Sequence, residues 1–286
     1  MKKALITGIG GQDGYYLSRL LKQKGYAVYG TTRKSPRLPD EKFDEIYHLA
    51  SQGHTSIKFG NRSVQTDVTG SGALRILEGL RLSKCSSRFV YAGSSAMFGN
   101  SPAPTDENTS VCPVTPYGCA KAYGYWLTKS YREQYGLHCS TGILFNHESP
   151  RRKEYCVSRK ISMAAARIKL GQQKRLKLGD IESVRDWGYA PDYVYAMWLM
   201  AQQDCPDDYI IASGRGYPVS EILRATFEYF NLDWEKYVTY KKGEKSTVIG
   251  DSTKIRKKLG WTPITNFYQM VKIMAQDAYE NCQEEL

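Results

Sequence analysis

The pair Tyr117 and Lys121 is the most informative feature of the sequence, and Ser94 and Ser95 lie a short distance before it. A Tyr and a Lys four residues apart lie on one face of a helix, where the ammonium can stabilise a phenolate. Such a tyrosine can take a proton from a substrate oxygen, or give one to it, while a hydride moves. The same spacing recurs on solvated helices, so the pair gains weight only from its neighbours. We predict that Tyr117, Lys121, Ser94 and Ser95 are catalytic.

A glycine-rich turn follows the first predicted strand, with the spacing Gly8-x-x-Gly11-x-x-Gly14. Glycines at such a turn let the backbone approach a diphosphate, whose charge the N-terminus of the next helix favours. A glycine-rich connection without a ligand is the alternative, and the position between a strand and a helix argues against it. The residues predicted to bind a dinucleotide here are Thr7, Gly8, Gly10, Gly11, Gln12, Asp13 and Gly14.

Arg33, Lys34 and Ser35 follow the second predicted strand, where an acidic residue would bind the ribose 2′-hydroxyl of NAD. Two cations and a hydroxyl instead suit a 2′-phosphate, so the sequence favours NADP over NAD. For Lys34, a solvated surface loop is the alternative.

Composition restricts the class of protein. The chain has 286 residues, of which 41% are hydrophobic and 24% are charged, as in ordinary globular proteins. No apolar run is long enough to cross a bilayer, and we expect no membrane association. The net charge of +11 is spread along the chain and mixed with acids, so we do not expect a nucleic-acid partner. The seven cysteines form no CxxC pair, which predicts reduced thiols, a cytoplasmic protein and no metal site.

The first half of the chain alternates apolar strands with amphipathic helices, which predicts an α/β, Rossmann-type doubly wound parallel sheet. Strands are expected at 3–8, 26–32, 44–50, 88–93, 138–145 and 209–213, and helices at 14–24, 62–82, 117–135, 157–171, 191–203, 219–230 and 266–279. We predict an NADP-binding Rossmann domain at 1–147 with a return segment around 185–214. Residues 148–184 and 215–286 are predicted to form a smaller substrate-binding lobe.

Longer stretches of the chain resemble the GDP-mannose 4,6-dehydratase family of extended short-chain dehydrogenases/reductases. They are Thr7-Gly-Ile-Gly-Gly-Gln-Asp-Gly14, Gly142-Ile-Leu-Phe-Asn-His-Glu-Ser-Pro-Arg-Arg152, Arg185-Asp-Trp-Gly188 with Asp192-Tyr193, and Asp251-Ser-Thr-Lys254 before Leu259-Gly-Trp261. Enzymes of that family oxidise a GDP-linked sugar at C4 with bound NADP, eliminate water across C5 and C6, and return the hydride to C6.

The resemblance implies a role for each matching position. Tyr117 would be the C4 base, Lys121 its partner, and Ser94 the hydroxyl beside the C4 oxygen. Cofactor-lining residues would be Leu49, Ala50, Ser51, Gln52, His147 and Arg152. Asn146, Glu148 and Arg185 would contact the nucleotide sugar. The resemblance also implies at least a homodimer, through the helices at 62–82 and 117–135, with a tetramer as the alternative.

Three departures separate this chain from the family pattern. Ala96 occupies the position of the glutamate that removes the C5 proton, and alanine cannot transfer a proton. Only residues 35–43 separate the second strand from the next, where the family has another strand and helix, so we expect a sheet one strand narrower. At 237–250 the family's Arg-Pro-x-Glu element is missing, which leaves the GDP end of the pocket open to question.

Ala96 and the intact Ser/Tyr/Lys set together favour a C4 4-ketoreductase or epimerase acting with NADP on a GDP-4-keto-6-deoxy sugar. One alternative is a GDP-mannose 4,6-dehydratase with a displaced base, for which Glu148 is one candidate. A second alternative is a non-catalytic NADP-binding sensor that kept the fold and lost the reaction.

Overall fold

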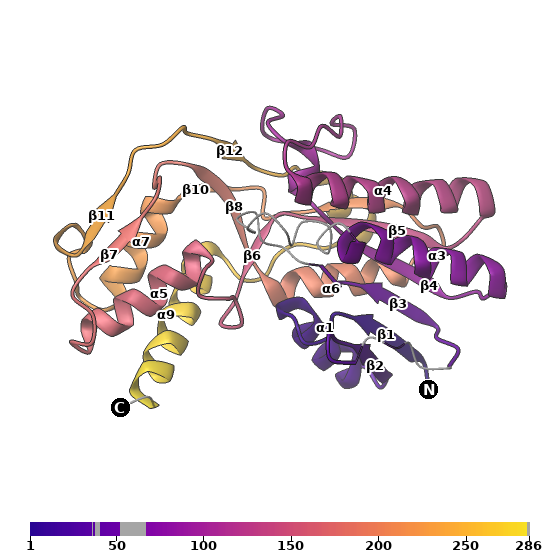
Figure 1. Ribbon diagram of the computed structural model, residues 1–286, viewed down its shortest axis with the longest axis horizontal. Helices are drawn as coiled ribbons and strands as arrows, with labels where there is room; N and C mark the ends of the chain where they lie inside the picture. Colours follow the sequence, from indigo (N-terminus) through magenta and orange to yellow (C-terminus); the bar gives the residue numbers. More distant parts are fainter. Residues whose placement is uncertain (36, 38–40, 52–66, 285–286) are drawn as a thin grey trace.

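The computed structural model describes residues 1–35, 37, 41–51 and 67–284. Figure 1 shows two lobes side by side, one built on a large sheet and the other on helices α5 (Val157–Lys169), α7 (Val219–Tyr229) and α9 (Phe267–Glu284). The strands β6 and β8 lie where the two lobes meet.

The larger lobe is built on a parallel sheet of six strands in the order β2-β1-β3-β4-β5-β9. These are β1 (Lys3–Thr7), β2 (Ala27–Thr31), β3 (Glu45–His48), β4 (Arg88–Ser94), β5 (Cys139–Leu144) and β9 (Asp208–Ile211). The predicted fold class is confirmed. Since the described residues between β2 and β3 form no strand, β2 is an edge of the sheet, as the short connection predicted.

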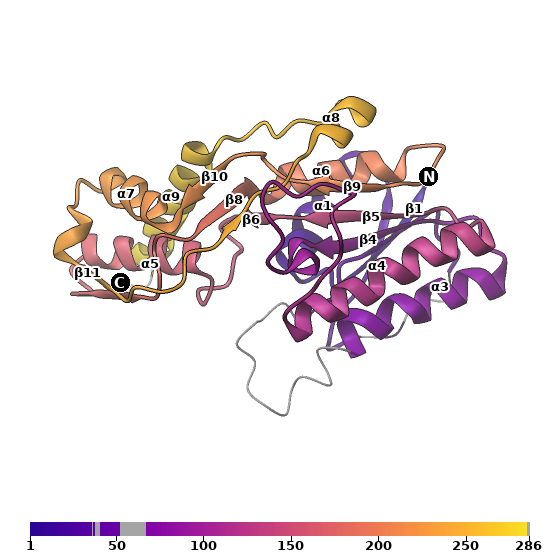
Figure 2. The ribbon, with the colours of Figure 1, turned by 90° about the horizontal axis from the view of Figure 1, so that it is seen from above.

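Helices cover both faces of this sheet. Successive side chains of a strand point to opposite faces, and here the side chains on both faces are apolar. Phe89 and Tyr91 of β4 pack on one face with α3 (Gly72–Ser83) and α4 (Pro116–Tyr135). Val90 and Ala92 pack on the other face with α1 (Gln12–Gln23) and α6 (Ala190–Ala201). Figure 2 shows α3 and α4 side by side along the sheet. Each fully buried large apolar side chain contributes about 1.5–3 kcal/mol to this packing.

The predicted helix at 62–82 lies partly outside the described residues. Its described part begins as a π-helical turn, η1 (Asp67–Ser71), and continues as α3. On the neighbouring α4, Tyr123 and Trp126 are 45% and 51% exposed. The predicted dimer through these helices stays a prediction.

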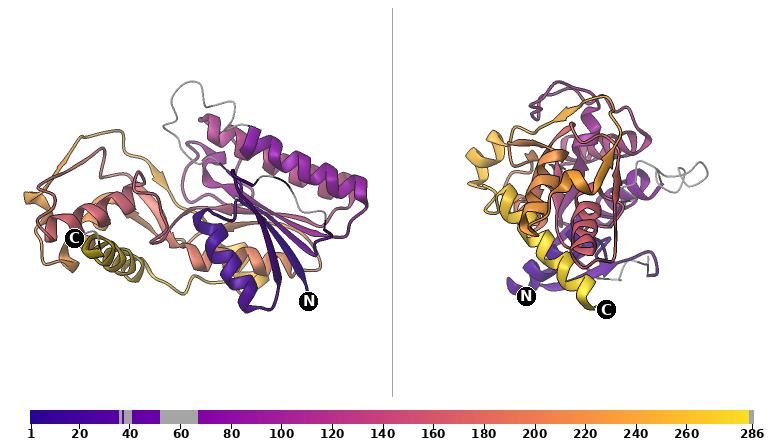
Figure 3. Two further views of the ribbon diagram at one scale, coloured as in Figure 1. Left: turned by 60° about the horizontal axis from the view of Figure 1, so that its bottom comes forward. Right: turned by 90° about the vertical axis from the view of Figure 1, so that its left-hand side faces the viewer.

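The smaller lobe has its own apolar core between α5 (Val157–Lys169), α7 (Val219–Tyr229) and α9 (Phe267–Glu284). Figure 3 shows α9 in this lobe, away from the large sheet. Several short strands were not predicted: β6 (Asn146–Glu148), β7 (Leu176–Leu178), β8 (Val184–Tyr189), β10 (Gly216–Pro218), β11 (Val238–Tyr240) and β12 (Thr247–Val248). They pair as β10-β8-β12 with β6 on β8, and as β11-β7. Helix α8 (Thr253–Leu259) and the 3₁₀ turn η3 (Trp234–Lys236) were also not predicted.

The chain crosses between the lobes more than once. After β8 it forms α6, which packs on α1, and then β9, which completes the large sheet. Arg132 of α4 secures β9 through a bidentate ion pair with Asp208, at 2.9 and 2.6 Å, and both side chains are largely buried. Removing one partner of such a pair typically costs about 3–5 kcal/mol, so this contact holds the far edge of the sheet firmly. The predicted domain boundaries stay a prediction.

No described helix is long and apolar enough to cross a membrane. In the same residues, no three or more His, Cys, Asp or Glu side chains are grouped so that they could hold a metal ion.

Candidate active site

Tyr117 and Lys121 lie in the first two turns of α4. The helix begins at Pro116, and the hydroxyl of Thr115 caps it by accepting a hydrogen bond from the Gly118 amide at 3.0 Å. A proline at the first position and a threonine cap are strong signals for a helix start. Because the cap fixes where α4 begins, it also fixes the position of Tyr117 in the first turn of the helix.

Lys121 is almost fully buried, at 3% exposure. Its ammonium donates a hydrogen bond of 2.6 Å to the carbonyl of Ala92 in β4. The same nitrogen lies 5.9 Å from the ring centroid of Tyr117 and 5.3 Å from that of Tyr91. Lys121 therefore places a buried cation beside the Tyr117 ring.

Ser94 ends β4, and Ser95 begins the 3₁₀ turn η2 (Ser95–Phe98). The Ser94 hydroxyl accepts a hydrogen bond of 3.3 Å from the Ala96 amide, which caps this turn. A Cβ atom at Gly118 would collide with the Ala96 carbonyl, so the start of α4 packs directly on η2. The structure thus brings the predicted Ser94, Tyr117 and Lys121 together at the carboxyl end of β4.

The glycine turn after β1 is packed so closely that side chains would collide at two of its glycines. Gly8 has a φ of +78°, and a Cβ there would lie 2.9 Å from the Cα of Ala50. A Cβ at Gly14 would lie 2.6 Å from the Gly8 carbonyl oxygen. Gly11 caps α1 without any side-chain hydrogen bond, so the first amide groups of the helix are left for a ligand. Gly10, also predicted, lies at the exposed tip of the same turn.

The ends of β1 and β3 are held together beside this turn. The hydroxyl of Thr7 lies 2.7 Å from Nδ1 of His48 and accepts a hydrogen bond of 3.3 Å from the Ala50 amide. Leu49 and Ala50 contact the turn at the position where a Cβ of Gly8 would lie, and Ser51 follows them. Thr7 therefore supports the scaffold, whereas Leu49 and Ala50 line the turn. Gln52 lies outside the described residues.

Gln12 and Asp13 point toward the segment that follows β5. The Asp13 carboxylate accepts a hydrogen bond of 3.0 Å from Nε2 of His147. Gln12 donates to the His147 carbonyl at 3.0 Å and accepts from the Ser149 hydroxyl at 2.7 Å. The structure thus ties the glycine turn to the lobe junction through side chains that were predicted to contact the cofactor. Ser149 was not predicted, and its only signal in the sequence is its place within the 142–152 stretch.

Arg33, Lys34 and Ser35 lie in an exposed turn directly after β2. Backbone hydrogen bonds of 3.0 and 3.2 Å between Thr32 and Ser35 close this turn. Neither cation forms an ion pair with another described residue. Both are therefore available to an anionic ligand beside the glycine turn.

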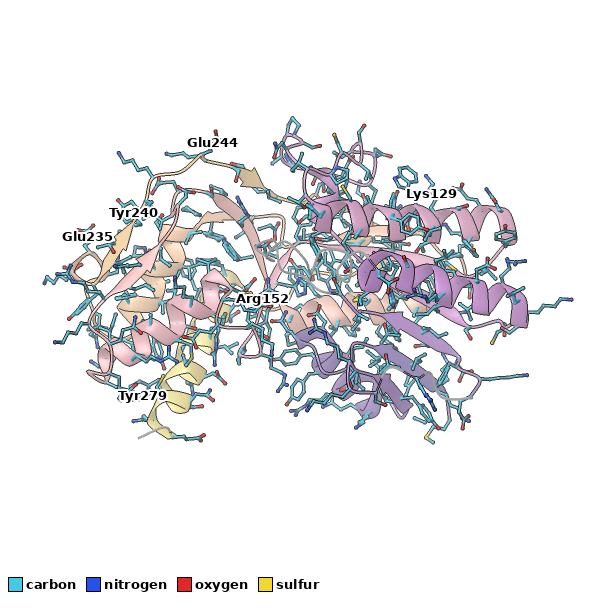
Figure 4. All side chains as sticks on the ribbon, viewed as in Figure 1. Lys129, Arg152, Glu235, Tyr240, Glu244 and Tyr279 are labelled. Carbon is cyan, nitrogen blue, oxygen red and sulfur yellow. The ribbon has the colours of Figure 1, made fainter. Side chains whose placement is uncertain are left out.

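Glu148 and Arg152 form an ion pair at the junction of the lobes, where Figure 4 places Arg152. The Glu148 side chain is 1% exposed, lies 3.1 Å from Nε of Arg152 and accepts a hydrogen bond from the Ser158 hydroxyl. The Glu148 charge raises the pKa of Arg152. Since Glu148 is buried and paired, it is not placed to act as the displaced base considered from the sequence.

Asn146 and Arg185 come from the paired strands β6 and β8, where Asn146 is in register with Trp187. The Arg185 guanidinium donates hydrogen bonds of 2.8 Å to the carbonyls of Val184 and Ser246 and to the Ser246 hydroxyl. Burial lowers the pKa of Arg185. No ion pair of this cation with a described carboxylate forms, so it could receive an anionic ligand.

Comparison with known protein families places these features in context. A family model described as GDP-mannose 4,6 dehydratase matches residues 37–274. GDP-mannose 4,6 dehydratase 2 of Arabidopsis thaliana is 40% identical over 330 aligned positions, covering 99% of this chain and 88% of that protein. GDP-mannose 4,6-dehydratase of Yersinia enterocolitica is 36% identical, covering 92% of this chain and 90% of that protein. The first alignment is 44 positions longer than this chain, as expected if the chain carries deletions.

Solved structures share the fold at lower identity. RMD from Pseudomonas aeruginosa, complexed with NADPH, has a TM-score of 0.90 at 22% identity and covers 98% of this chain and 100% of its own. The dTDP-glucose 4,6-dehydratase of Bacillus anthracis, in complex with NAD, has a TM-score of 0.84 at 17% identity, with 100% and 98% coverage.

Replacing Gly14 with alanine should destabilise the protein by about 1–3 kcal/mol, because the new methyl group would collide with the Gly8 carbonyl. Urea unfolding measures the change. Gly179→Ala is the control, since a Cβ there meets nothing within 4 Å, and it should shift stability by no more than about 0.5 kcal/mol. Equal stability of the two variants would contradict the described packing of the turn.

Proposed function

This chain belongs to the GDP-mannose 4,6-dehydratase family, and we propose that it oxidises a GDP-linked hexose at C4 and then eliminates water across C5 and C6. The observation that carries the proposal is the arrangement of Ser94, Tyr117 and the buried Lys121 at one end of β4. The whole-length likeness to proteins named GDP-mannose 4,6-dehydratase supports it. These relatives favour the dehydratase over the C4 ketoreductase or epimerase expected from Ala96, so that expectation becomes the second candidate.

The proposed cofactor is NADP, which would accept the hydride from C4 and return it to the sugar. The glycine turn fits a dinucleotide, because its glycines keep the backbone clear and α1 begins without a side-chain cap. The backbone of the turn would hold the diphosphate, with Leu49 and Ala50 beside it. Arg33 and Lys34 would hold the 2′-phosphate, since both are exposed cations directly after β2.

The chain's own residues would carry the proton at C4. Ser94 would orient the C4 hydroxyl by a hydrogen bond. Tyr117, as a phenolate, would take the proton from that hydroxyl as the C4 hydrogen departs with its electron pair. Lys121 would stabilise the phenolate from its fixed position under the helix.

The elimination step is where Ala96 matters. A C4 ketone acidifies the C5 proton, but Ala96 offers no carboxylate to remove it, and Glu148 is buried against Arg152. Loss of a positioned general base typically slows a step by about 10²- to 10⁴-fold. We therefore propose a slow dehydratase in which C4 oxidation outpaces elimination. Reduction of a 4-keto-6-deoxy sugar is the second candidate, because Ala96 leaves the C4 chemistry intact and blocks elimination.

Incubation with GDP-mannose, and separately with GDP-4-keto-6-deoxymannose plus NADPH, distinguishes these functions by mass spectrometry of the sugar. Loss of one water from GDP-mannose without net NADPH change supports the dehydratase, and Ala96→Glu should then accelerate it by about 10²-fold or more. Stoichiometric NADPH oxidation with a gain of two hydrogens on the keto sugar would replace it with the reductase. NADPH binding without turnover of either sugar would favour the non-catalytic sensor.

Tyr117→Phe should lower turnover by about 10²- to 10⁴-fold, because the ring stays in place and only the proton-transferring hydroxyl is lost. Steady-state kinetics with the active substrate measures the loss. Tyr123→Phe is a matched control on the same helix, where the side chain is 45% exposed, and its turnover should match the wild type. Comparable turnover of Tyr117→Phe and wild type would exclude the assigned role.

Substituting both Arg33 and Lys34 with alanine should reduce the preference for NADPH over NADH by about tenfold or more, because charged hydrogen bonds to a phosphate contribute about 1.5–3 kcal/mol. Calorimetric titration with both cofactors measures the ratio. Lys169→Ala, an exposed cation on α5, should leave the ratio unchanged. An unchanged ratio in the double variant would contradict the NADP assignment.

We also propose a homodimer through α3 and α4, supported by the exposed Tyr123 and Trp126. Light scattering measures the mass in solution, and a value near the 32.4 kDa of one chain would contradict the dimer.

The seven free cysteines support a reducing, cytoplasmic compartment, which fractionation of the source cells would test.

A further inference from the structure

His147 is held so that both of its ring nitrogens face hydrogen-bond acceptors. Nδ1 lies 2.7 Å from the Phe145 carbonyl, and Nε2 lies 3.0 and 3.1 Å from the two oxygens of Asp13. A carbonyl and a carboxylate can only accept, so both nitrogens must donate. Only the imidazolium carries a proton on each nitrogen. Since the pKa of Asp13 is lowered to about 2, Asp13 is ionised at neutral pH and this geometry calls for a charged His147.

The surroundings of His147 favour this charge. Its ring stacks on Tyr193 at 4.8 Å, and the side chain is 11% exposed. Burial alone would lower the pKa of His147, but the Asp13 carboxylate raises it above the ordinary value, although Arg152 opposes this. Burial likewise disfavours the Asp13 charge, yet His147 lowers the pKa of Asp13 to about 2. The two groups form an ion pair between α1 and β6.

Asp13 lies in the first turn of α1, the turn whose amide groups would receive the cofactor diphosphate. A carboxylate favours the positive end of a helix but repels a second anion at the same place. If the Asp13 carboxylate and the diphosphate are separated by ~5 Å, the length of one helical turn, their repulsion is large enough to weaken cofactor binding. Gln12, the adjacent side chain, is neutral and already bonded to His147 and Ser149.

Resting on the proposed NADP-binding function, we infer that His147 is the counter-charge that allows Asp13 to sit in a diphosphate-binding turn. Both are positioning residues that act on the cofactor through the charge of the turn. Asp13 ties the turn to the lobe junction, and protonated His147 cancels its negative charge.

The inference fixes the direction of a pH effect. Because the pKa of His147 is raised in the folded protein, its contribution is complete below about pH 6.5 and is lost as the pH rises through the folded-state value. Deprotonation of His147 leaves the Asp13 charge uncompensated, so the affinity for the cofactor should fall as the pH rises through the folded-state pKa of His147. Besides Asp13, the charged or titratable groups that face the imidazole are Arg152 after β6 and Tyr193 of α6. Asp13 itself titrates only near pH 2, far below that window.

Imidazole NMR measures the charge of His147 without any cofactor. The chain has four histidines, and loss of one signal in His147→Gln assigns the resonance. We expect a titration midpoint above about 6.5 for His147 and a lower midpoint in Asp13→Asn. His48 is the internal reference, since burial lowers its pKa to about 3 and it should stay neutral at pH 5. A neutral His147 at pH 6 would overturn the inference.

Calorimetric binding of NADPH to the full chain then separates charge from shape. His147→Gln should bind about tenfold more weakly, and adding Asp13→Asn to that variant should restore affinity to within about threefold of wild type. A purely structural role predicts that the double variant binds no better than the single one, and that result would overturn the inference alone. His138→Gln, directly before the amino end of β5 and therefore away from the carboxyl ends of the strands, should bind normally. Failure of the wild type to bind NADPH would overturn the proposed function and this inference together.

Discussion

The hydrogen bond from Lys121 to the Ala92 carbonyl is the contact on which the geometry of the candidate catalytic residues depends. It joins α4, which lies on one face of the sheet, to the carboxyl end of the central strand β4. A buried ammonium is costly unless it is paired or hydrogen-bonded, so this bond also sets how deeply α4 is seated. Tyr117 is one helical turn away and Ser94 is two residues along the strand. Their mutual position follows from that one attachment.

The fold was largely predictable from the sequence because its signals are local. Short continuous apolar runs such as that of β4 predict buried strands, and Thr115-Pro116 marks the start of α4 within one residue of the prediction. The short strands β6 to β8 and β10 to β12 were not predicted, because pairing with distant segments defines them more than their own residues do. Their pairings join segments far apart in the chain.

The sequence nominates residues for the candidate site but does not say what each of them contacts. Spacing and resemblance selected Glu148 and Asp13, yet they gave no means of knowing what each carboxylate would face. Ser158 lies ten residues after Glu148, and His147 lies 134 residues after Asp13. Burial and pairing by such partners decide whether a carboxylate is a base, a ligand or a support. That information lies in tertiary packing and not in residue type.

The edge position of β2 has a consequence for folding and engineering. Among the described strands, only β1 pairs with it, so one row of its backbone groups is paired with no described strand. Charged side chains beside an edge strand discourage such association. Arg33 and Lys34, directly after β2, are well placed to act as gatekeepers against aggregation. Redesign of cofactor choice at these two positions would therefore also change how cleanly the protein folds at high concentration.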